Sequence, residues 1–352
     1  MAASDLLDLR ARLLAGGVIP AHPLALTAAR ALDEKRQRAL TRYYIDAGAT
    51  ALAVGVHTTQ FEVHSPAVGL YTPVLELAAR TAEEWSRGRR TPLRIAGVIG
   101  RTQQAVHEAG IAAQLGYDAA LVSLGALHDA DDDALVAHCT AVAGVLPVFG
   151  FYLQAAVGGR VLTASFWRRF FEIPDVVAVK VAPFDRYATL DVVRALAASG
   201  RVDEIALYTG NDDAIVHDLL SVFRCEGREL RFVGGLLGHW AYGTQAAVAL
   251  LARIRAEHDT PGRHAAELHR IAADVTDLNA VVFDPAHRFA GCLSGIQHML
   301  LLDGLLDTDL CLGHTERLSP GQAASIAAAR ARHPNLLDTD FIAAHRDRWL
   351  AA

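Results

Sequence analysis

The chain has 352 residues, of which 52% are apolar and 20% are charged, and its formal net charge is −6. This length allows one large α/β barrel or two ordinary domains, and the apolar content excludes a chain that is disordered throughout. The 33 lysines and arginines are scattered along the chain, and the densest basic patch is only RGRR at 87–90. The sequence therefore shows no nucleic-acid-binding footprint.

The cysteines and the N-terminal residues indicate the cellular compartment of the protein. The four cysteines lie far apart and form no spacing typical of a metal site: Cys139, Cys225, Cys292 and Cys311. The first residues, MAASDLLDLRARLLAGG, contain early acidic side chains and no long apolar core, unlike a signal peptide. No apolar run is long enough to cross a bilayer. We therefore expect a cytoplasmic protein with reduced thiols, no metal site and no membrane partner.

Eight short apolar runs, several of them rich in β-branched residues, predict eight strands. In chain order these are 16–20, 51–56, 92–98, 118–124, 147–152, 176–182, 204–209 and 230–236. Strand–helix repeats of roughly 30 residues predict an α/β fold of the (β/α)8 TIM-barrel type that closes near residue 250. A doubly wound open sheet is the alternative, which we disfavour because no glycine-rich dinucleotide-binding motif follows the first strand.

Amphipathic segments between these strands predict the helices. Examples are 33–48, with Asp33 as its cap and Gly48 as its stop, and 102–116, with Thr102 as its cap and Gly116 at its end. A third such segment is 189–200.

The last hundred residues have helical spacing only. They predict helices at 265–282, 292–306 and 319–333, after a joint at 257–264. We expect residues 1–255 to form the barrel with an N-terminal helix, and residues 256–352 to form a C-terminal helical layer packed on it.

A lysine stands inside the most apolar of the strands, in DVVAVKVAPFDR at 175–186. A buried ammonium is costly unless it is paired or loses its proton. One interpretation is that Lys180 has a lowered pKa and supplies a neutral amine that condenses with a ketone. The other is a structural lysine that reaches solvent or pairs with Asp185.

Hydroxyl groups follow two other predicted strands. Tyr152 ends the fifth strand, and if it and Lys180 both point inward, its phenol can exchange protons with a Schiff base. Taken alone, it is more commonly an amphipathic tyrosine at the rim. Thr58 and Thr59 follow the second strand, where they could cradle a carboxylate or merely form a turn.

Taken together and in order, these motifs resemble the dihydrodipicolinate synthase / N-acetylneuraminate lyase family of class I aldolases. The motifs are HTTQF (57–61), FYLQ (151–154), AVKVA (178–182), YTGND (208–212) and FVGGLLGHW (232–240). The resemblance covers roughly residues 15–250 and includes the 28 residues between Tyr152 and Lys180. It implies a homodimer or homotetramer and no metal or organic cofactor, because the lysine imine does the chemistry.

By the same resemblance, Lys180 forms the imine with a 2-oxo acid such as pyruvate. Tyr152 is the proton shuttle, and Thr58 with Thr59 binds the carboxylate and relays a proton. The candidate substrate-binding residues near strand ends are His57, Thr58, Gln154, Arg186, Asn211, Gly234 and His239, with His22 and Trp240 as weaker candidates. Each histidine taken alone is more commonly structural than catalytic.

The sequence departs from the family at several of these motifs. Gln60 and Phe61 replace the family's Gly-Glu, and Leu153-Gln154-Ala155 replaces its Asn-Val-Pro. The arginine that the synthases carry five residues after the tyrosine is replaced by Val157. These changes argue against the lysine-pathway reaction and for a different aldehyde or leaving group.

Three functions stay open at this point. The first is an aldolase or lyase that joins or splits a 2-oxo acid and an aldehyde. The second is a Schiff-base dehydratase or hydrolase acting on a 2-oxo sugar acid, and the third is a non-catalytic binding paralogue. A metal-dependent hydrolase is disfavoured, because no strand carries an H-x-H pair or a carboxylate cluster.

Overall fold

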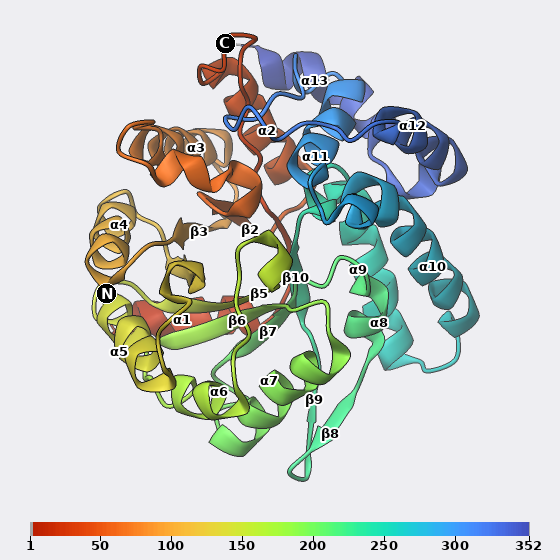
Figure 1. Cartoon of the computed structure of the whole chain (residues 1–352). Helices are drawn as coiled ribbons and strands as arrows, with labels where there is room; N and C mark the ends of the chain where they lie inside the picture. Colours follow the sequence, from red (N-terminus) through yellow and green to blue (C-terminus); the bar gives the residue numbers. More distant parts are fainter. Residues whose placement is uncertain (1–2, 352) are drawn as a thin grey trace. The chain divides into compact units, whose positions relative to one another are not determined.

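The computed structural model describes residues 3–351 and has the (β/α)8 fold that the sequence predicts. Eight strands form one sheet in the order β1-β10-β7-β6-β5-β4-β3-β2, so most neighbours in the sheet are also neighbours in the chain (Figure 1). Their bounds are β1 (Val18–Pro20), β2 (Ala51–Val54), β3 (Leu93–Val98), β4 (Ala119–Val122), β5 (Val148–Leu153), β6 (Val176–Ala182), β7 (Ala206–Thr209) and β10 (Gly234–Leu237). Strands β3 to β7 pair in parallel with one another in chain order, and β10 pairs in parallel with β7. Parallel pairing is what the strand–helix repeats require.

Helices precede the first strand and follow each strand. They are α1 (Ala3–Leu14), α2 (Glu34–Asp46), α3 (Tyr71–Trp85), α4 (Thr102–Gln114), α5 (Asp132–Ala143), α6 (Ala164–Phe170), α7 (Arg186–Ser199), α8 (Ile215–Leu220) and α9 (Thr244–Asp259). Asp33 caps α2 as predicted, since its carboxylate accepts from the Arg36 amide at 3.0 Å. The Thr102 cap is wrong: Arg101 holds that position, and the Thr102 hydroxyl bonds instead to His138 at 3.0 Å.

The chain divides into two compact units. The first unit runs through Gly17 and includes Arg94–Leu236, so it carries α1 and the elements from α4 to β9. The second includes Val18–Leu93 and the residues from Leu237 onward, so it carries β1, β2 and the C-terminal helices. The predicted boundary at residue 255 remains a prediction.

A hairpin interrupts the region predicted as the eighth strand. Two short strands, β8 (Phe223–Cys225) and β9 (Arg228–Leu230), pair antiparallel and extend away from the other strands of the first unit (Figure 1). Glu226 and Gly227 between them both have positive φ, 50° and 71°, which is the backbone of a tight two-residue hairpin turn. The sheet strand itself therefore begins only at Gly234.

The C-terminal helices are α10 (Ala265–Val282), α11 (Cys292–Leu302), α12 (Gln322–Arg332) and α13 (Thr339–Leu350). The bounds of α10 are those predicted, whereas α13 was not predicted as a separate helix. Within the second unit α13 packs against α2, where Trp349 and Tyr43 are both fully buried. None of the four cysteines forms a disulfide. None of the helices in residues 3–351 is long and apolar enough for a membrane span.

Candidate active site

Lys180 lies on β6 with its side chain almost completely buried, at 7% exposure. In the register of the sheet it sits between Phe151 on β5 and Tyr208 on β7. Its Nζ is 4.5 Å from the centre of the Phe151 ring. Opposed residues of paired strands point to the same face, so the lysine lies on an aromatic-lined face of the sheet.

A glycine makes room for this side chain. A Cβ placed on Gly210, just after β7, would lie 2.6 Å from Lys180 Cε and 2.8 Å from Ala182 Cβ. Any other residue at this position would therefore have to push the lysine aside. Gly210 and Phe151 are the nearest neighbours that the sequence did not single out.

Tyr152 points to the opposite face, which corrects the expectation that its phenol faces the lysine. Its ring lies 5.5 Å from that of Trp167 on α6, and its hydroxyl accepts a hydrogen bond from the Leu162 amide at 3.3 Å. A Cβ on Gly150, two residues earlier, would lie 2.7 Å from Phe170 on the same helix. Residues 150 and 152 thus face α6, and Phe151 faces the lysine. Burial raises the pKa of the Tyr152 phenol.

A register shift explains the difference. Val148 pairs with Val176, 28 residues later, but Phe149 pairs with Ala178, so one residue of β6 is skipped between the two pairs. From there on paired residues are 29 apart, and Lys180 is opposed by Phe151 rather than by Tyr152. Because side chains alternate along a strand, one residue of slip decides which face a side chain occupies.

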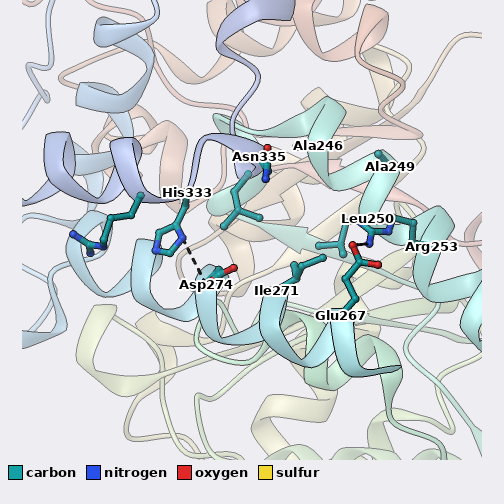
Figure 2. Close-up of a pocket in the computed structure, with 11 residues that line it drawn as sticks. Ala246, Ala249, Leu250, Arg253, Glu267, Ile271, Asp274, His333 and Asn335 are labelled. Carbon is teal, nitrogen blue, oxygen red and sulfur yellow. Dashed lines mark ion pairs between the residues drawn. The ribbon is translucent and has the colours of Figure 1, made fainter. Parts of the chain in front are cut away.

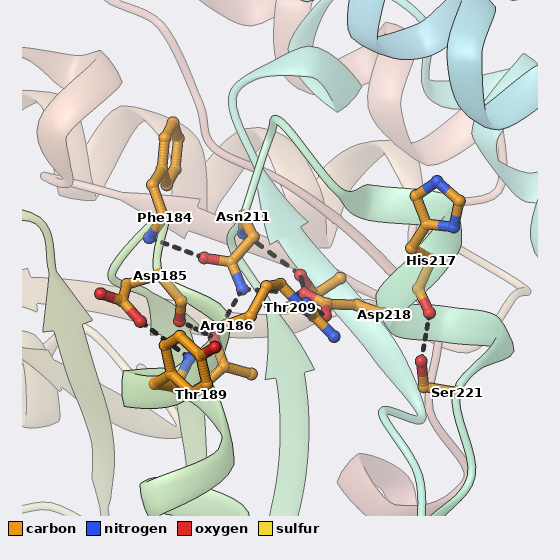
Figure 3. A network of polar contacts seen from close by, with 10 residues as sticks. Phe184, Asp185, Arg186, Thr189, Thr209, Asn211, His217, Asp218 and Ser221 are labelled. Atoms are coloured by element: carbon orange, nitrogen blue, oxygen red, sulfur yellow. Dashed lines mark hydrogen bonds and ion pairs between the residues drawn. The ribbon is translucent and has the colours of Figure 1, made fainter.

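A polar network joins the loops that follow β6 and β7 (Figure 3). Asp218 on α8 is fully buried, and its carboxylate accepts from Thr209 Oγ1 at 2.5 Å and from Asn211 Nδ2 at 2.9 Å. It also forms an ion pair with Arg186, the first residue of α7. Burying this carboxylate is tolerable because the guanidinium and two neutral donors satisfy it.

Two predicted substrate-binding residues therefore already have structural partners. The Asn211 side chain accepts from the Phe184 amide at 3.0 Å and donates to Thr189 at 3.2 Å, in addition to its bond to Asp218. The Arg186 guanidinium is half-exposed, with its charge paired by Asp218. An anion clamp at Arg186 stays a prediction, and it would have to share the guanidinium with this carboxylate.

The two threonines after β2 differ sharply. The Thr59 hydroxyl donates to the His22 carbonyl at 2.6 Å and accepts from the amides of Gly55 and Val56 at 3.0 and 3.2 Å. It therefore closes the turn, as the turn interpretation predicted. Thr58 is only 6% exposed, and within residues 3–351 its hydroxyl has no hydrogen-bond partner. A buried hydroxyl without a partner is costly, which makes Thr58 the better candidate for holding a ligand.

Three histidines have different surroundings. His22 is fully buried with ring nitrogens 2.9 Å from Pro23 O and from Thr41 Oγ1, and burial lowers its pKa to about 4. Burial likewise lowers the pKa of His239 to about 4, and its Nδ1 lies 2.6 Å from Asn279 Oδ1. His57 is half-buried beside Phe61. The first two are neutral at physiological pH.

The remaining predicted residues lie at strand ends. Gly234 is the first residue of β10, and a Cβ there would lie 2.1 Å from the Gly17 carbonyl oxygen. It permits a close backbone approach at the amino end of its strand, and its assignment to substrate binding stays a prediction. Gln154 follows β5, and its backbone N–H donates a hydrogen bond to the Ala182 carbonyl at 3.0 Å. Trp240 is buried.

The predicted residues are thus divided between the two units. His57, Thr58, Thr59 and His239 belong to the second unit, and Tyr152, Gln154, Lys180, Arg186, Asn211 and Gly234 belong to the first. Within the first, the structure brings Lys180, Phe151 and Gly210 together, and it brings Arg186 and Asn211 together around Asp218.

A separate cavity of about 270 Å³ lies in the second unit, between α9, α10 and the end of α12 (Figure 2). Its floor is apolar, with Leu250, Ile271 and Leu336, and ion pairs stand on its rim, including His333 with Asp274. None of the predicted site residues lines it. Nor do residues 3–351 contain a cluster of three or more side chains that could hold a metal ion.

No protein-family model matches the sequence, and no curated protein matches it. Solved structures do match. One is YagE, a prophage protein of the dihydrodipicolinic acid synthase family from E. coli K12, solved in complex with pyruvate. It is 18% identical to this chain, with a TM-score of 0.72, and the match covers 90% of this chain and 98% of YagE. Dihydrodipicolinate synthase from Acinetobacter baumannii, also complexed with pyruvate, is 20% identical over 90% and 98% of the two chains, with a TM-score of 0.71.

A third match is the dihydrodipicolinate synthase of Cyanidioschyzon merolae with lysine bound, which is 19% identical over 92% of this chain and 99% of that one, with a TM-score of 0.73. At such low identity these likenesses show the fold. They confirm the (β/α)8 architecture along nearly the whole length of each matched chain.

Proposed function

We propose that the protein is a Schiff-base-forming lyase, a divergent relative of the dihydrodipicolinate synthase family, in which Lys180 forms an imine with a 2-oxo acid. One observation carries the proposal. The chain has 33 lysines and arginines, yet only two are lysines, Lys35 and Lys180. Lys35 is exposed on α2, whereas Lys180 is buried on an apolar strand. Arginine cannot supply a neutral amine, so a buried lysine in an arginine-rich chain indicates a need for that amine.

The reaction follows from the amine. The neutral nitrogen of Lys180 adds to the keto carbon of the oxo acid, and loss of water from the carbinolamine gives the imine. The imine withdraws electrons from the neighbouring carbon, which allows a carbon–carbon bond to break or an enamine to add to an aldehyde. The solved structures of similar fold that contain pyruvate support a pyruvate-type acid.

Thr58 stays the contact for the acid's carboxylate that the resemblance implies. Its buried hydroxyl lacks a partner in the described part of the chain, whereas the Thr59 hydroxyl is already used by the backbone. Tyr152 has no part in the proposal, because it faces helix α6. The cytoplasmic location and the homodimer or homotetramer remain predictions from the sequence.

Reductive trapping tests the proposal. The protein is incubated with pyruvate and borohydride, and the modified peptide is mapped by mass spectrometry. We expect one adduct, on the β6 peptide that contains Lys180. The exposed Lys35 serves as an internal control for non-specific modification. A label on Lys35 alone, or none with any 2-oxo acid of a broad panel, contradicts the proposal.

The outward position of Tyr152 favours one second candidate, a binding paralogue without turnover, since a phenol on the lysine's face is missing from β5. Such a protein would still be trapped on Lys180 and stabilised by its oxo acid, but would release no aldehyde. Product analysis with the oxo acid that traps best separates it from the lyase. The same panel identifies a dehydratase, which would trap and dehydrate a 2-oxo sugar acid.

A further inference from the structure

The long connection between α11 and α12 covers the turn that carries Thr58. It runs from residue 303 to residue 321 without helix or strand, and connections of this length usually have a function. All of its contacts below lie within the second unit. The Leu312 amide donates to Gln60 Oε1 at 2.6 Å, and the Thr308 hydroxyl donates to the Leu26 carbonyl at 3.2 Å.

The turn under this connection holds two unsatisfied donors. The hydroxyl of Thr58 and the Nε2 of Gln60 are both shielded from solvent and have no hydrogen-bond partner in the described chain. Gln60 is completely buried in a left-handed backbone conformation, with φ of 71°. Because Leu312 binds Gln60 Oε1, movement of this connection would change the surroundings of the Gln60 amide directly.

Two carboxyl groups meet at the same point of the connection. A Cβ on Gly313 would lie 3.1 Å from Glu62 Oε1 and 3.5 Å from Glu316 Cγ, so the two side chains flank this glycine. Glu62 belongs to the short helix Phe61–His64, directly after the Thr58 turn. The Glu316 Oε2 is buried and has no partner among the described residues.

The surroundings of Glu316 explain its raised pKa. Burial, then the charge of Glu62, raises the pKa of Glu316 to about 7, against a smaller opposing effect of the Cys311 thiol. Cys311 keeps its proton, since burial raises its pKa to about 12. The other charged or titratable groups nearby are Asp309, paired with His298, and Arg30, which bonds to the Cys311 carbonyl and to His314.

We propose that residues 308–316 form a proton-dependent latch on the Thr58 turn, closed while the buried carboxyl of Glu316 is protonated and loosened when it ionises beside Glu62. A buried carboxyl is more stable with its proton than as an anion, and a second carboxylate nearby adds repulsion once Glu316 ionises. The contribution to stability is complete below the ordinary pKa of a glutamate and is lost as pH rises through about 7. The latch lies on the turn of Thr58, the predicted carboxylate contact, but its opening does not require an imine at Lys180.

Hydrogen exchange of the Leu312 amide tests the latch in the full-length protein. With rates corrected for the intrinsic effect of pH, we expect its protection to fall about tenfold from about pH 6 to about pH 8, because the closed state binds the proton more tightly. Glu316→Gln should remove this dependence. Glu62→Gln, which serves if the first variant folds poorly, should weaken it, because burial alone still raises the pKa of Glu316. Glu226→Gln, in the exposed hairpin of the first unit, is the matched control and should keep it.

Two results overturn the proposal. One is constant Leu312 protection across this pH range in the unmodified protein. The other is an undiminished pH dependence in both the Glu316→Gln and the Glu62→Gln variant. Neither result affects the trapping of Lys180 by borohydride. Failure of the latch proposal can therefore be distinguished from failure of the proposed imine chemistry.

Discussion

The strand pair β5–β6 and the turn after β2 each carry a pair of polar residues that the sequence assigned to one reaction. In the strand pair, Lys180 and Tyr152 lie on opposite faces, and only the lysine occupies the aromatic face. In the turn, Thr58 and Thr59 differ by their hydrogen bonds, since only Thr58 has a hydroxyl without a partner in the described chain. In both regions one residue of the pair is available for chemistry and the other is structural.

The largest effect should come from replacing Lys180. Lys180→Met keeps much of the side-chain volume and removes the nucleophile, so turnover should fall by roughly 10³-fold or more and the borohydride adduct should disappear. Circular dichroism and urea unfolding should show an intact and equally stable fold, because a buried polar amine is replaced by an apolar chain of similar size. Lys35→Met is the matched control and should keep both activity and adduct. Activity of the Lys180 variant near that of this control would reject the mechanism.

Gly210→Ala should have the next largest effect. The added methyl group would stand 2.6 Å from Lys180 Cε, and displacing a reacting group by about 1 Å can cost 10–100-fold in kcat. Overpacking should also lower the free energy of unfolding by about 1–3 kcal/mol. Gly110→Ala, in α4 with no atom within 4 Å of its Cβ, is the control and should leave kcat unchanged. Equal kinetics in the two variants would mean that Gly210 does not position the lysine.

The two threonines provide a direct comparison. Thr59→Val removes a hydroxyl that serves His22, Gly55 and Val56, so the free energy of unfolding should fall by about 2–3 kcal/mol. Thr58→Val removes no hydrogen bond, so stability should hold while the KM for the oxo acid rises about tenfold, the value of one hydrogen bond to a charged group. Urea unfolding and steady-state kinetics measure the two effects. A normal KM in the Thr58 variant would leave its hydroxyl without a role.

Tyr152→Phe should have the smallest effect. The phenol accepts one hydrogen bond, from the Leu162 amide, so its loss should cost about 1 kcal/mol of unfolding free energy. Turnover should be nearly unchanged, because the hydroxyl does not face Lys180. The pattern in the sequence predicted a large loss of proton transfer instead. A strong fall in kcat with normal KM would therefore restore that interpretation against the geometry.

The fold was predictable because its signals are local. Short apolar runs and helical spacing recur along the chain, and the eight predicted strands all occur, one of them, 176–182, with the predicted bounds. The split of the last strand was missed because Glu226 adopts a positive φ without being glycine or asparagine. Lys180 was recognisable from its apolar neighbours alone.

The rest of the site depends on contacts that no local pattern contains. The register shift after Val148 sets the face of Tyr152, and nothing in FYLQ reveals it. The Thr59 hydroxyl is engaged by a carbonyl 37 residues away in sequence, and Arg186 by a carboxylate 32 residues away. One signal in the sequence did point to Lys180, namely the scarcity of lysine. The chain contains only two lysines, Lys35 and Lys180.

That scarcity has a consequence for a protein proposed to handle carbonyl compounds. Free aldehydes glycate exposed lysines, and repeated adducts of this kind damage the surfaces of many proteins. Here the described surface offers them a single lysine, Lys35, because arginine carries nearly all of the positive charge. An aldehyde substrate would thus meet few exposed lysine amines, whereas Lys180, the proposed nucleophile, lies buried on β6.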